Sequence, residues 1–377
     1  MYLNPGRSPY STTDRTVIGR SHAADVRRLL APCPAHRATP LISLPTFAAE
    51  LGLGQVHLKA EGARMGLASF KALGGAYAVA LLVKARAEAA LGRPLLPADL
   101  VSAEVRAVAH GLTVACASAG NHGLAVAAGA RVFGAQAVVF LSEAVPERFA
   151  LRLQAQGAVV RRAGAGYEDS MAAAQAEADA HGWTLVSDSS WPGYTQVPLE
   201  VMRGYTVLLD EAADALEADG GPASHVFVQA GVGGLAAAAA AYLRDRWGED
   251  FRFVTVEPEG APCLLESVRA GRPLRIRGGT TTLGRLDCKE PSLLAFELLD
   301  HLSDGFMTIT DADAEAAARR LSTQGVPLSA CGAAGAAGLV ALCGDPAGRR
   351  DLDLTPASRV LLIGTEAAET HPEGDPA

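Results

Sequence analysis

The stretch Ser69-Phe70-Lys71-Ala72-Leu73-Gly74-Gly75 places one lysine among small and apolar residues. Burial disfavours the charged ammonium form of a lysine, and the neutral amine that results can attack a carbonyl carbon to form an imine. A lysine at the start of a helix can also run along the surface and keep its ammonium group in water. The stretch alone leaves both interpretations of Lys71 open.

Segments typical of strands and helices alternate on both sides of Lys71. Residues 55–59 alternate as a strand does, and the apolar run from Ala72 to Ala90 is typical of a helix. Strands separated by helices indicate parallel βαβ units, and therefore an α/β fold that binds its ligands at the carboxyl ends of the strands. Further strands are expected at 105–110, 113–117, 136–141, 159–162, 184–186, 225–229, 251–257 and 360–363, and further helices at 121–133, 146–156, 167–181, 194–217, 235–246, 261–269 and 293–301.

The composition is that of an ordinary globular protein. The chain has 377 residues, of which 49% are hydrophobic and 20% are charged, so it is long enough to form a large core divided between two lobes. Its 33 lysines and arginines against 41 acidic residues give a net charge of -8. This negative charge argues against nucleic acid or an anionic membrane surface as a partner.

The N-terminus and the cysteines indicate the compartment. Residues 1–20 lack the apolar core of a signal peptide, and no uninterrupted apolar run suggests a membrane span, so the protein is expected to be cytoplasmic. The cysteines form no C-x-x-C pair, so neither a metal site nor a disulfide framework is indicated. The six are Cys33, Cys116, Cys263, Cys288, Cys331 and Cys343.

A first glycine-containing junction between a strand and a helix reads Ala117-Ser118-Ala119-Gly120-Asn121-His122-Gly123. Glycines allow the backbone to approach a ligand closely, and the N-terminus of the following helix favours an anion such as a carboxylate. Ser118 and Asn121 add polar side chains. The same sequence is also compatible with a simple glycine turn and a helix cap.

A second junction reads Gln229-Ala230-Gly231-Val232-Gly233-Gly234-Leu235-Ala236 and suits a phosphate group at the start of a helix. It also contains the pattern G-x-G-x-x-A, and Glu257 ends the next expected strand, as in a dinucleotide-binding fingerprint. The junction therefore leaves both a cofactor monophosphate and a nicotinamide dinucleotide open.

A third junction reads Val186-Ser187-Asp188-Ser189-Ser190-Trp191-Pro192-Gly193-Tyr194 and places an acid after a strand and next to aromatic residues. Asp188 in this position can act as a general base or bind the ammonium group of a substrate. An aspartate there can also simply cap a helix or a turn.

Taken together and in this order, these segments resemble the fold type II pyridoxal-phosphate enzymes, the superfamily of the tryptophan synthase β-subunit, and within it the diaminopropionate ammonia-lyases. The resemblance covers most of residues 38–366 and implies two lobes, each with a mainly parallel twisted sheet flanked by helices. The large cofactor-binding lobe would combine residues 1–85 and 191–377, the small lobe would span 86–190, and the protein would be a homodimer. The similar segments are Leu58-Lys59-Ala60-Glu61, Phe70 to Ala78, Gly120 to Gly123, Asp188 with Trp191 and Tyr194, His225 to Gly233, and Val256-Glu257-Pro258.

The resemblance implies roles for the matched residues. Lys71 would hold pyridoxal 5'-phosphate (PLP) covalently with Phe70 beside it, and Asn121 would hydrogen-bond the phenolic oxygen of the cofactor. The residues that would bind the cofactor phosphate are Gly231, Val232, Gly233, Gly234 and Leu235. The residues that would lie around an amino-acid substrate are Ser118, Ala119, Gly120, His122, Asp188 and Tyr194.

The resemblance further implies a lyase. It would remove ammonia, or another β-leaving group, from a β-substituted amino acid such as L-2,3-diaminopropionate by way of an aminoacrylate, and would release pyruvate and ammonia. The freed Lys71 or Asp188 would take the α-proton, depending on the stereochemistry of the substrate, because the two would lie on opposite faces of the cofactor. Ala119 stands where that family carries an aspartate, so turnover of a D-configured substrate is expected to be weak or absent.

Three other functions stay open beside this one. They are a PLP-dependent β-replacement synthase that acts on a serine-like or cysteine-like substrate, an NAD-dependent dehydrogenase, and a protein that binds PLP without turnover.

Near the C-terminus the chain departs from the family pattern a second time. Gly364 stands where relatives place a serine against the pyridine nitrogen, so Thr365 or Cys331 is expected to take that place. A neutral partner there would leave the nitrogen unprotonated, which suits elimination. Cys263 and Cys288 fall where the family also carries cysteines; unpaired thiols are expected, with a disulfide under oxidation as the alternative.

Overall fold

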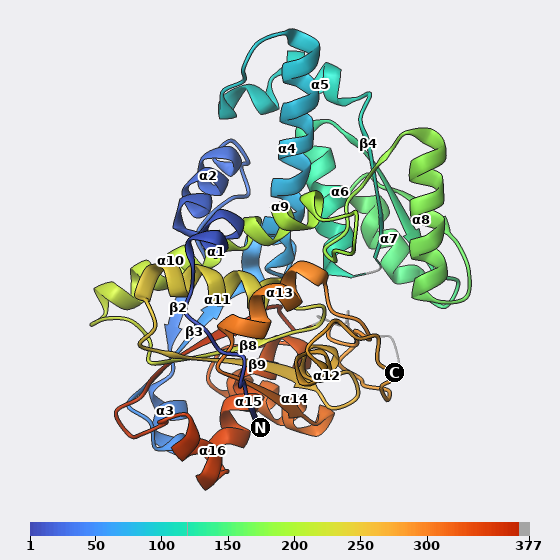
Figure 1. Ribbon diagram of the computed structural model, residues 1–377. Helices are drawn as coiled ribbons and strands as arrows, with labels where there is room; N and C mark the ends of the chain where they lie inside the picture. Colours follow the sequence, from blue (N-terminus) through green and yellow to red (C-terminus); the bar gives the residue numbers. More distant parts are fainter. Residues whose placement is uncertain (119, 369–377) are drawn as a thin grey trace. The chain divides into compact units, whose positions relative to one another are not determined.

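The computed structural model, shown in Figure 1, describes residues 1–118 and 120–368. The chain forms two compact units, which are described in turn. The first unit consists of Met1–Thr16, Thr39–Ala63 and the chain from Leu208 onward, and the second consists of Val17–Ala38 and Arg64–Val207. None of the helices in the described part of the chain is long and apolar enough to cross a membrane.

A seven-stranded sheet in the order β1-β10-β9-β8-β11-β3-β2 forms the centre of the first unit. The inner strands pair in parallel, whereas β1 and β2 pair in antiparallel fashion at the two edges. Strand β8 is buried along its whole length, as is typical of a parallel sheet that is covered on both faces. The strands are β1 (Tyr2–Leu3), β2 (Leu41–Ser43), β3 (Gln55–Ala60), β8 (His225–Gln229), β9 (Arg252–Pro258), β10 (Gly305–Ile309) and β11 (Arg359–Gly364).

The direction in which strands are added to this sheet reverses between β8 and β11. From β8 the chain continues to β9 and then β10 on one side, while β11 lies on the other side of β8, next to β3. In α/β proteins, ligands bind at the carboxyl ends of the strands at such a reversal. The glycine junction that begins after Gln229 and the predicted residue Thr365 follow the carboxyl ends of these two strands.

Helix α15 (Ala330–Cys343) packs closely on the sheet because the residues that face it are small. A Cβ added to Gly335 would lie 3.0 Å from the carbonyl oxygen of Phe227, and one added to Gly338 would lie 2.7 Å from Cγ2 of Val256. The start of α15 therefore lies beside the end of β8. The other helices that belong wholly or mainly to this unit are α1 (Thr12–Val17), α3 (Pro45–Leu51), α10 (Thr206–Ala218), α11 (Gly234–Trp247), α12 (Cys263–Ala270), α13 (Leu293–Leu302), α14 (Asp311–Thr323) and α16 (Pro346–Asp351).

The second unit contains a four-stranded parallel sheet in the order β6-β5-β4-β7. Its strands are β4 (Thr113–Ala117), β5 (Gln136–Leu141), β6 (Val159–Arg162) and β7 (Thr184–Leu185). Its α-helices are α2 (Arg20–Leu30), α4 (Lys71–Leu91), α5 (Ala103–Ala109), α6 (Asn121–Phe133), α7 (Glu147–Ala155), α8 (Tyr167–His181) and α9 (Gln196–Gly204). Two 3-10 helices, η1 (Glu61–Gly66) and η2 (Pro97–Val101), precede α4 and α5.

Helix α4 begins at Lys71 and packs against both α6 and α9. A Cβ added to Gly74 would lie 2.6 Å from the carbonyl oxygen of Val201, and one added to Gly75 would lie 2.6 Å from Cβ of Ala125. Only glycine allows such close approach. The glycine pair after Lys71 therefore fixes the first turn of α4 between two neighbouring helices, which holds the lysine in place.

The α/β architecture with parallel sheets is as predicted, but two predictions of local structure were wrong and one region had no predicted element. Residues 105–110 were predicted as a strand, but 105–109 belong to α5 and His110 follows its end. Helix α5 begins after Ser102, whose Oγ accepts a hydrogen bond from the backbone N–H of Val105 at 3.2 Å. The helix predicted at 194–217 is interrupted at Tyr205 and forms α9 and α10. No element was predicted between residues 301 and 360, where β10, α14, α15 and α16 lie.

The compact units also divide the chain differently from the predicted lobes. The predicted large lobe contained residues 1–85 and 191–377, and the small lobe contained 86–190. In the structure, residues 17–38, 64–85 and 191–207 group with the second unit. The reason is that α4 and α9 pack on each other, so that both belong to the same hydrophobic core.

Candidate active site

Lys71 forms an ion pair with Asp188 in the second unit. Its Nζ donates a hydrogen bond to Oδ2 of Asp188, although the two residues are 117 positions apart in the sequence. The side chains are partly buried, with 23% of Lys71 and 17% of Asp188 exposed. Phe70, just before the lysine, packs edge-on against the ring of Tyr205 at 4.9 Å between centroids. The structure thus brings together the two residues predicted to be catalytic.

The charge state of Asp188 follows from its surroundings. Burial acts to raise the pKa of the Asp188 carboxyl, but the charge of Lys71 and its hydrogen bond outweigh burial and hold that pKa below its usual range. Asp188 is therefore an ionised carboxylate at neutral pH. A carboxylate next to an amine can accept or return a proton over a short distance, as general acid–base catalysis requires.

Tyr194 holds the turn that carries Asp188. Its hydroxyl donates a hydrogen bond to the carbonyl oxygen of Leu185 at 2.8 Å and accepts one from the backbone N–H of Ser187 at 3.1 Å. Its ring stacks on that of Trp191, with the centroids 4.4 Å apart. Because the hydroxyl proton is used within the turn, Tyr194 positions Asp188 in this structure, and its contact with substrate stays a prediction.

The first glycine junction lies at the start of α6. The backbone N–H of Gly120 donates to Oγ of Ser118 at 3.2 Å, and Asn121 is the first residue of the helix. A Cβ added to Gly123 would lie 2.3 Å from the carbonyl oxygen of Ser118, so this turn requires glycine there. A helix N-terminus of this kind attracts an anion, as predicted for a substrate carboxylate. Ala119 lies outside the described residues.

His122 is buried within the same junction. Its Nε2 donates to the carbonyl oxygen of Val186 at 2.8 Å, and only 3% of the residue is exposed. Burial lowers the pKa of His122, so its ring is neutral near pH 7. With the proton on Nε2, the buried Nδ1 is an acceptor without a partner among the described residues. Its predicted place beside the substrate carboxylate stays a prediction.

The glycine loop of the first unit connects β8 to α11. Gly233 has φ of 98°, which favours glycine, and a Cβ there would lie 3.0 Å from Cβ of Ala295. A Cβ on Gly231 would lie 2.9 Å from Sγ of Cys288. Because no side chain fits, the backbone N–H groups at the start of α11 are left to bind a small anion. A small anion such as the phosphate of PLP suits this cradle, and the predicted roles of Val232, Gly234 and Leu235 in binding it stay predictions.

Glu257, which a dinucleotide-binding site would place against a ribose, is used for another purpose. It is fully buried, and its two carboxylate oxygens accept hydrogen bonds from the backbone N–H groups of Leu264 and Leu265 at 2.7 and 2.8 Å. Burial raises the pKa of Glu257 to about 8. Since both oxygens bind the first turn of α12, the structure disfavours the dehydrogenase alternative.

Thr365 and Cys331, the two candidates for the pyridine nitrogen, lie near one another in the first unit because both contact Gln229. Nε2 of Gln229 is 3.0 Å from Oγ1 of Thr365 and 3.2 Å from the carbonyl oxygen of Cys331. Burial raises the pKa of the Cys331 thiol to about 12, so it stays protonated. A Cβ on Gly364 would lie 2.8 Å from Cδ2 of Leu58, so a side chain at this position would require Leu58 to move.

Sequence reasoning missed Gln229. This amide is 3% exposed and ends a strand whose other residues are His225-Val226-Phe227-Val228. A polar residue at the end of an apolar strand, directly before a glycine loop, was the available signal.

Neither Cys263 nor Cys288 forms a disulfide within the described residues. Cys263 is buried, and its Sγ lies 3.6 Å from the carbonyl oxygen of Gly231. Cys288 is partly buried and touches the position that a Cβ of Gly231 would take. Both thiols therefore flank the glycine loop.

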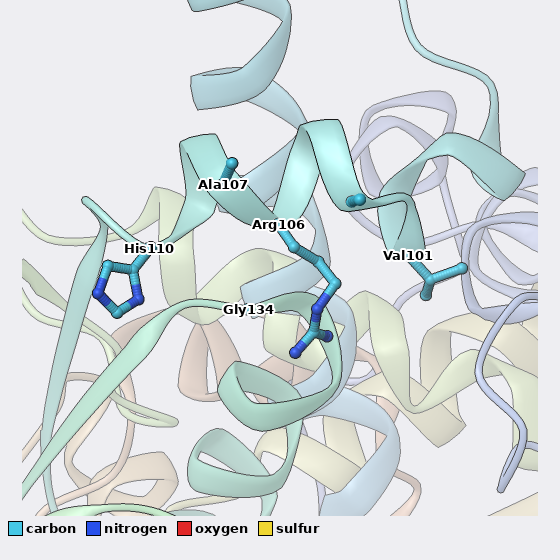
Figure 2. Close-up of a pocket in the computed structure, with 6 residues that line it drawn as sticks. Val101, Arg106, Ala107, His110 and Gly134 are labelled. Carbon is cyan, nitrogen blue, oxygen red and sulfur yellow. The ribbon is translucent and has the colours of Figure 1, made fainter.

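A surface hollow of about 590 Å³ lies in the second unit. Figure 2 shows residues that line it. Its lining consists of Val101, Ala103, Arg106, Ala107, His110 and Gly134. The guanidinium of Arg106 donates to the carbonyl oxygens of Arg131 and Val132, and so caps the end of α6. Helix α5, which carries Arg106, contacts α4 through Arg86, roughly four helical turns after Lys71. The hollow is therefore separate from the candidate active site.

Comparisons with known proteins agree with these observations. The family model described as "Pyridoxal-phosphate dependent enzyme" matches residues 33–365. The diaminopropionate ammonia-lyase of Escherichia coli K12 is 31% identical over 329 residues, which are 86% of this chain and 81% of that protein. The enzyme of the same name from Salmonella typhimurium is 32% identical over 364 residues, with 90% and 87% covered.

Solved structures give the same result. The crystal structure of the Escherichia coli diaminopropionate ammonia-lyase in complex with D-serine has a TM-score of 0.87 and 28% identity, and covers 97% of this chain and 93% of that one. The same enzyme in complex with an aminoacrylate-PLP azomethine reaction intermediate has a TM-score of 0.86 and 29% identity, with 97% and 92% covered. The predicted resemblance and the predicted fold type II architecture are thereby confirmed.

Proposed function

Because this chain belongs to the pyridoxal-phosphate-dependent enzymes, we propose that it is a lyase that removes ammonia from a β-substituted amino acid such as L-2,3-diaminopropionate. The products would be pyruvate and ammonia. The observation that carries the proposal is the ion pair between Lys71 and Asp188 at the start of α4, which supplies an amine and an ionised carboxylate side by side. The similarity to diaminopropionate ammonia-lyases over most of the chain supports the substrate class.

Lys71 would bind the cofactor through Nζ, and Asp188 would accept a proton at Oδ2. When bound, PLP withdraws electrons from Cα of the substrate and makes the Cα–H bond acidic. Since Asp188 is held ionised by Lys71, it is ready to take that proton at neutral pH. Lys71, once free of the cofactor, would be the second base and would return a proton to the leaving group or the product.

The remaining predicted residues would bind and orient. The loop from Gly231 to Leu235 would hold the cofactor phosphate through its backbone N–H groups, and Asn121 would donate to the phenolic oxygen. The start of α6, with Ser118, Gly120 and His122, would hold the substrate carboxylate. These assignments rest on the closed glycine cradle and on the position of α6 after β4.

The expected preference for an L-configured substrate follows from Ala119. The resemblance implies an acid at this position for substrates of the opposite configuration, and alanine has no proton acceptor. Asp188 is then the carboxylate left to act, and it would serve one face only. We therefore propose that L-2,3-diaminopropionate is a much better substrate than its D-isomer.

A turnover assay with matched lysine variants tests the proposed function. Purified protein with PLP is supplied with L- and D-2,3-diaminopropionate, L-serine and L-cysteine, and pyruvate and ammonia are measured. Lys71→Ala should abolish release of both products. The matched control is Lys84→Ala, because Lys84 lies on the same helix and pairs only with the surface residue Glu88 among described groups.

The outcomes separate the alternatives. Release of pyruvate and ammonia from the L-isomer, lost only in Lys71→Ala, supports a lyase. Turnover that requires an added nucleophile would instead indicate β-replacement. Cofactor binding without any product would indicate a binding protein. Equal rates with both isomers would contradict the role given to Ala119.

We further propose a cytoplasmic homodimer. The resemblance supports the dimer, and no disulfide joins the six cysteines of the described chain, as is usual in a reducing compartment. Size-exclusion chromatography with light scattering checks the oligomeric state: the proposal expects twice the chain mass of 38.8 kDa, and a monomer would contradict it.

A further inference from the structure

We propose that Gln229 is a positioning residue that directs the hydroxyl proton of Thr365 toward the ring nitrogen of the cofactor. The inference rests on the proposed function, because it concerns how this chain would hold PLP. It concerns residues of the first unit alone, where Gln229 ends β8 and Thr365 follows β11. These two strands pair in parallel, and their carboxyl ends lie where the strand order reverses.

The side chain of Gln229 has only one chemically sensible orientation. Its nitrogen faces three carbonyl oxygens, those of Gly332 at 2.9 Å, Ile363 at 3.0 Å and Cys331 at 3.2 Å. Carbonyl oxygens only accept hydrogen bonds, so a flipped amide would set oxygen against oxygen at each of these contacts. The nitrogen must therefore point toward this group, and Thr365 faces a donor.

The donor role of Gln229 fixes the role of Thr365. Oγ1 of Thr365 lies 3.0 Å from Nε2 of Gln229, and an amide nitrogen offers no lone pair to a hydroxyl. Oγ1 consequently accepts from Gln229, and its own proton must go elsewhere. Within residues 1–118 and 120–368, no acceptor for that proton occurs, although Thr365 is only 5% exposed. This buried hydroxyl proton is therefore available to a ligand.

The N–H groups of the Gln229 amide have hydrogen-bond partners, whereas its oxygen has none in the described part of the chain. Oε1 of Gln229 is buried and has no hydrogen-bond partner in the described part of the chain. Its neighbour is Gly335, where a Cβ would lie 2.8 Å from that oxygen. An unpaired buried acceptor lowers stability, so a side chain that only joined β8 to α15 would be better replaced by one without the extra oxygen. The arrangement favours a positioning role over a purely structural one.

The consequence concerns the protonation of the cofactor. A hydroxyl that can only donate forms an O–H···N bond and keeps the ring nitrogen without a proton, whereas a hydroxyl free to rotate can also accept from a protonated nitrogen. Gln229 selects the first state. It also distinguishes Thr365 from Cys331, because Gln229 contacts the side chain of Thr365 but only the backbone of Cys331.

The test measures the ring nitrogen directly. Apoprotein is reconstituted with PLP labelled with ¹⁵N in the ring, and the ¹⁵N chemical shift is recorded in the resting enzyme without substrate. The wild-type signal should be that of an unprotonated ring. Gln229→Met, which keeps the length and removes the donor, and Thr365→Val, which removes the hydroxyl, should both move the signal toward the protonated position. Thr365→Ser and Cys331→Ala should leave it in place.

Several results would overturn the inference. One is an unchanged signal in folded, cofactor-loaded Gln229→Met, and another is a protonated signal in the wild type. If Gln229→Met does not fold, the Thr365 and Cys331 variants decide: movement in Cys331→Ala without movement in Thr365→Val would refute it. A wild-type protein that takes up no cofactor would instead refute the proposed function, and the inference with it.

Discussion

Replacing Asp188 by asparagine removes the charge that the proposed reaction needs while keeping the size of the side chain. In the structure, Asp188 is the one described partner of Lys71 Nζ, and its pKa lies below the usual range because the charge of the lysine outweighs burial. Asparagine cannot accept a proton at neutral pH. General acid–base catalysis contributes roughly 10²–10⁴-fold, so kcat/KM for L-2,3-diaminopropionate should fall by about that factor.

This loss corresponds to about 3 to 5 kcal/mol of transition-state stabilisation. Activity should not vanish entirely, because Lys71 remains as a second base. The assay follows pyruvate with lactate dehydrogenase and NADH. Asp25→Asn is the matched control, since Asp25 forms a surface ion pair with Arg28 in the same unit. Asp188→Asn with kcat/KM within threefold of the wild type, at unchanged cofactor content, would refute the role of Asp188 as base.

Three further predictions concern stability and cofactor binding. Lys59→Met should lower the free energy of unfolding by about 3–5 kcal/mol in urea titrations, because Lys59 is fully buried and its Nζ lies 2.5 Å from Oε2 of Glu211, whose buried carboxylate would lose this positive charge; a loss below 1 kcal/mol would contradict this. Gly233→Ala should weaken PLP binding at least about tenfold in apoprotein titrations, because φ of 98° and a Cβ contact of 3.0 Å both disfavour alanine; unchanged affinity would argue against the phosphate cradle. Burial raises the pKa of Glu257 from 4.5 to about 8. Between these two pH values the folded state binds more protons than the unfolded state does. The contribution of Glu257 to stability is therefore fully present below pH 4.5 and is lost as the pH rises toward 8. From pH 5 to pH 8, urea titrations should therefore show a smaller loss in the free energy of unfolding for Glu257→Gln than for the wild type. Equal losses would contradict the raised pKa of Glu257.

The start of α4 shows what local sequence can predict. The apolar run after Lys71 gave a helix at 72–90, and the helix spans Lys71–Leu91. The same sequence could not show why two glycines follow the lysine, because their reason lies in Val201 and Ala125, which come from other helices. Close packing of this kind is decided by tertiary contacts.

Helices α5 and α15 show why other parts could not be predicted. The residues of α5 alternate between apolar and polar over a short stretch, a pattern that fits a strand as well as a helix. The N-terminal cap by Ser102 stabilises the helix. Helix α15 consists largely of alanine and glycine, and its burial against β8 leaves no amphipathic pattern to detect. For α5 the deciding interaction is the single hydrogen bond at Ser102, and for α15 it is packing against a segment distant in the sequence.

The candidate site was predictable residue by residue but not contact by contact. Asp188, Asn121 and the loop at Gly231 could be predicted because they follow three strands, and α/β folds bind ligands at the carboxyl ends of their strands. The pairing of Asp188 with Lys71 and the contacts of Gln229 depend on segments more than 100 positions apart in the sequence. No local pattern encodes these distances.

The central claim, that Lys71 binds the cofactor of a lyase, is tested most directly by identifying the modified residue. Protein loaded with PLP is treated with borohydride, digested, and analysed by mass spectrometry, with absorbance recorded before and after treatment. We expect near-visible absorbance that borohydride abolishes, and a cofactor adduct on the peptide that contains Lys71. An adduct on another lysine, or a protein without cofactor absorbance, would contradict the account.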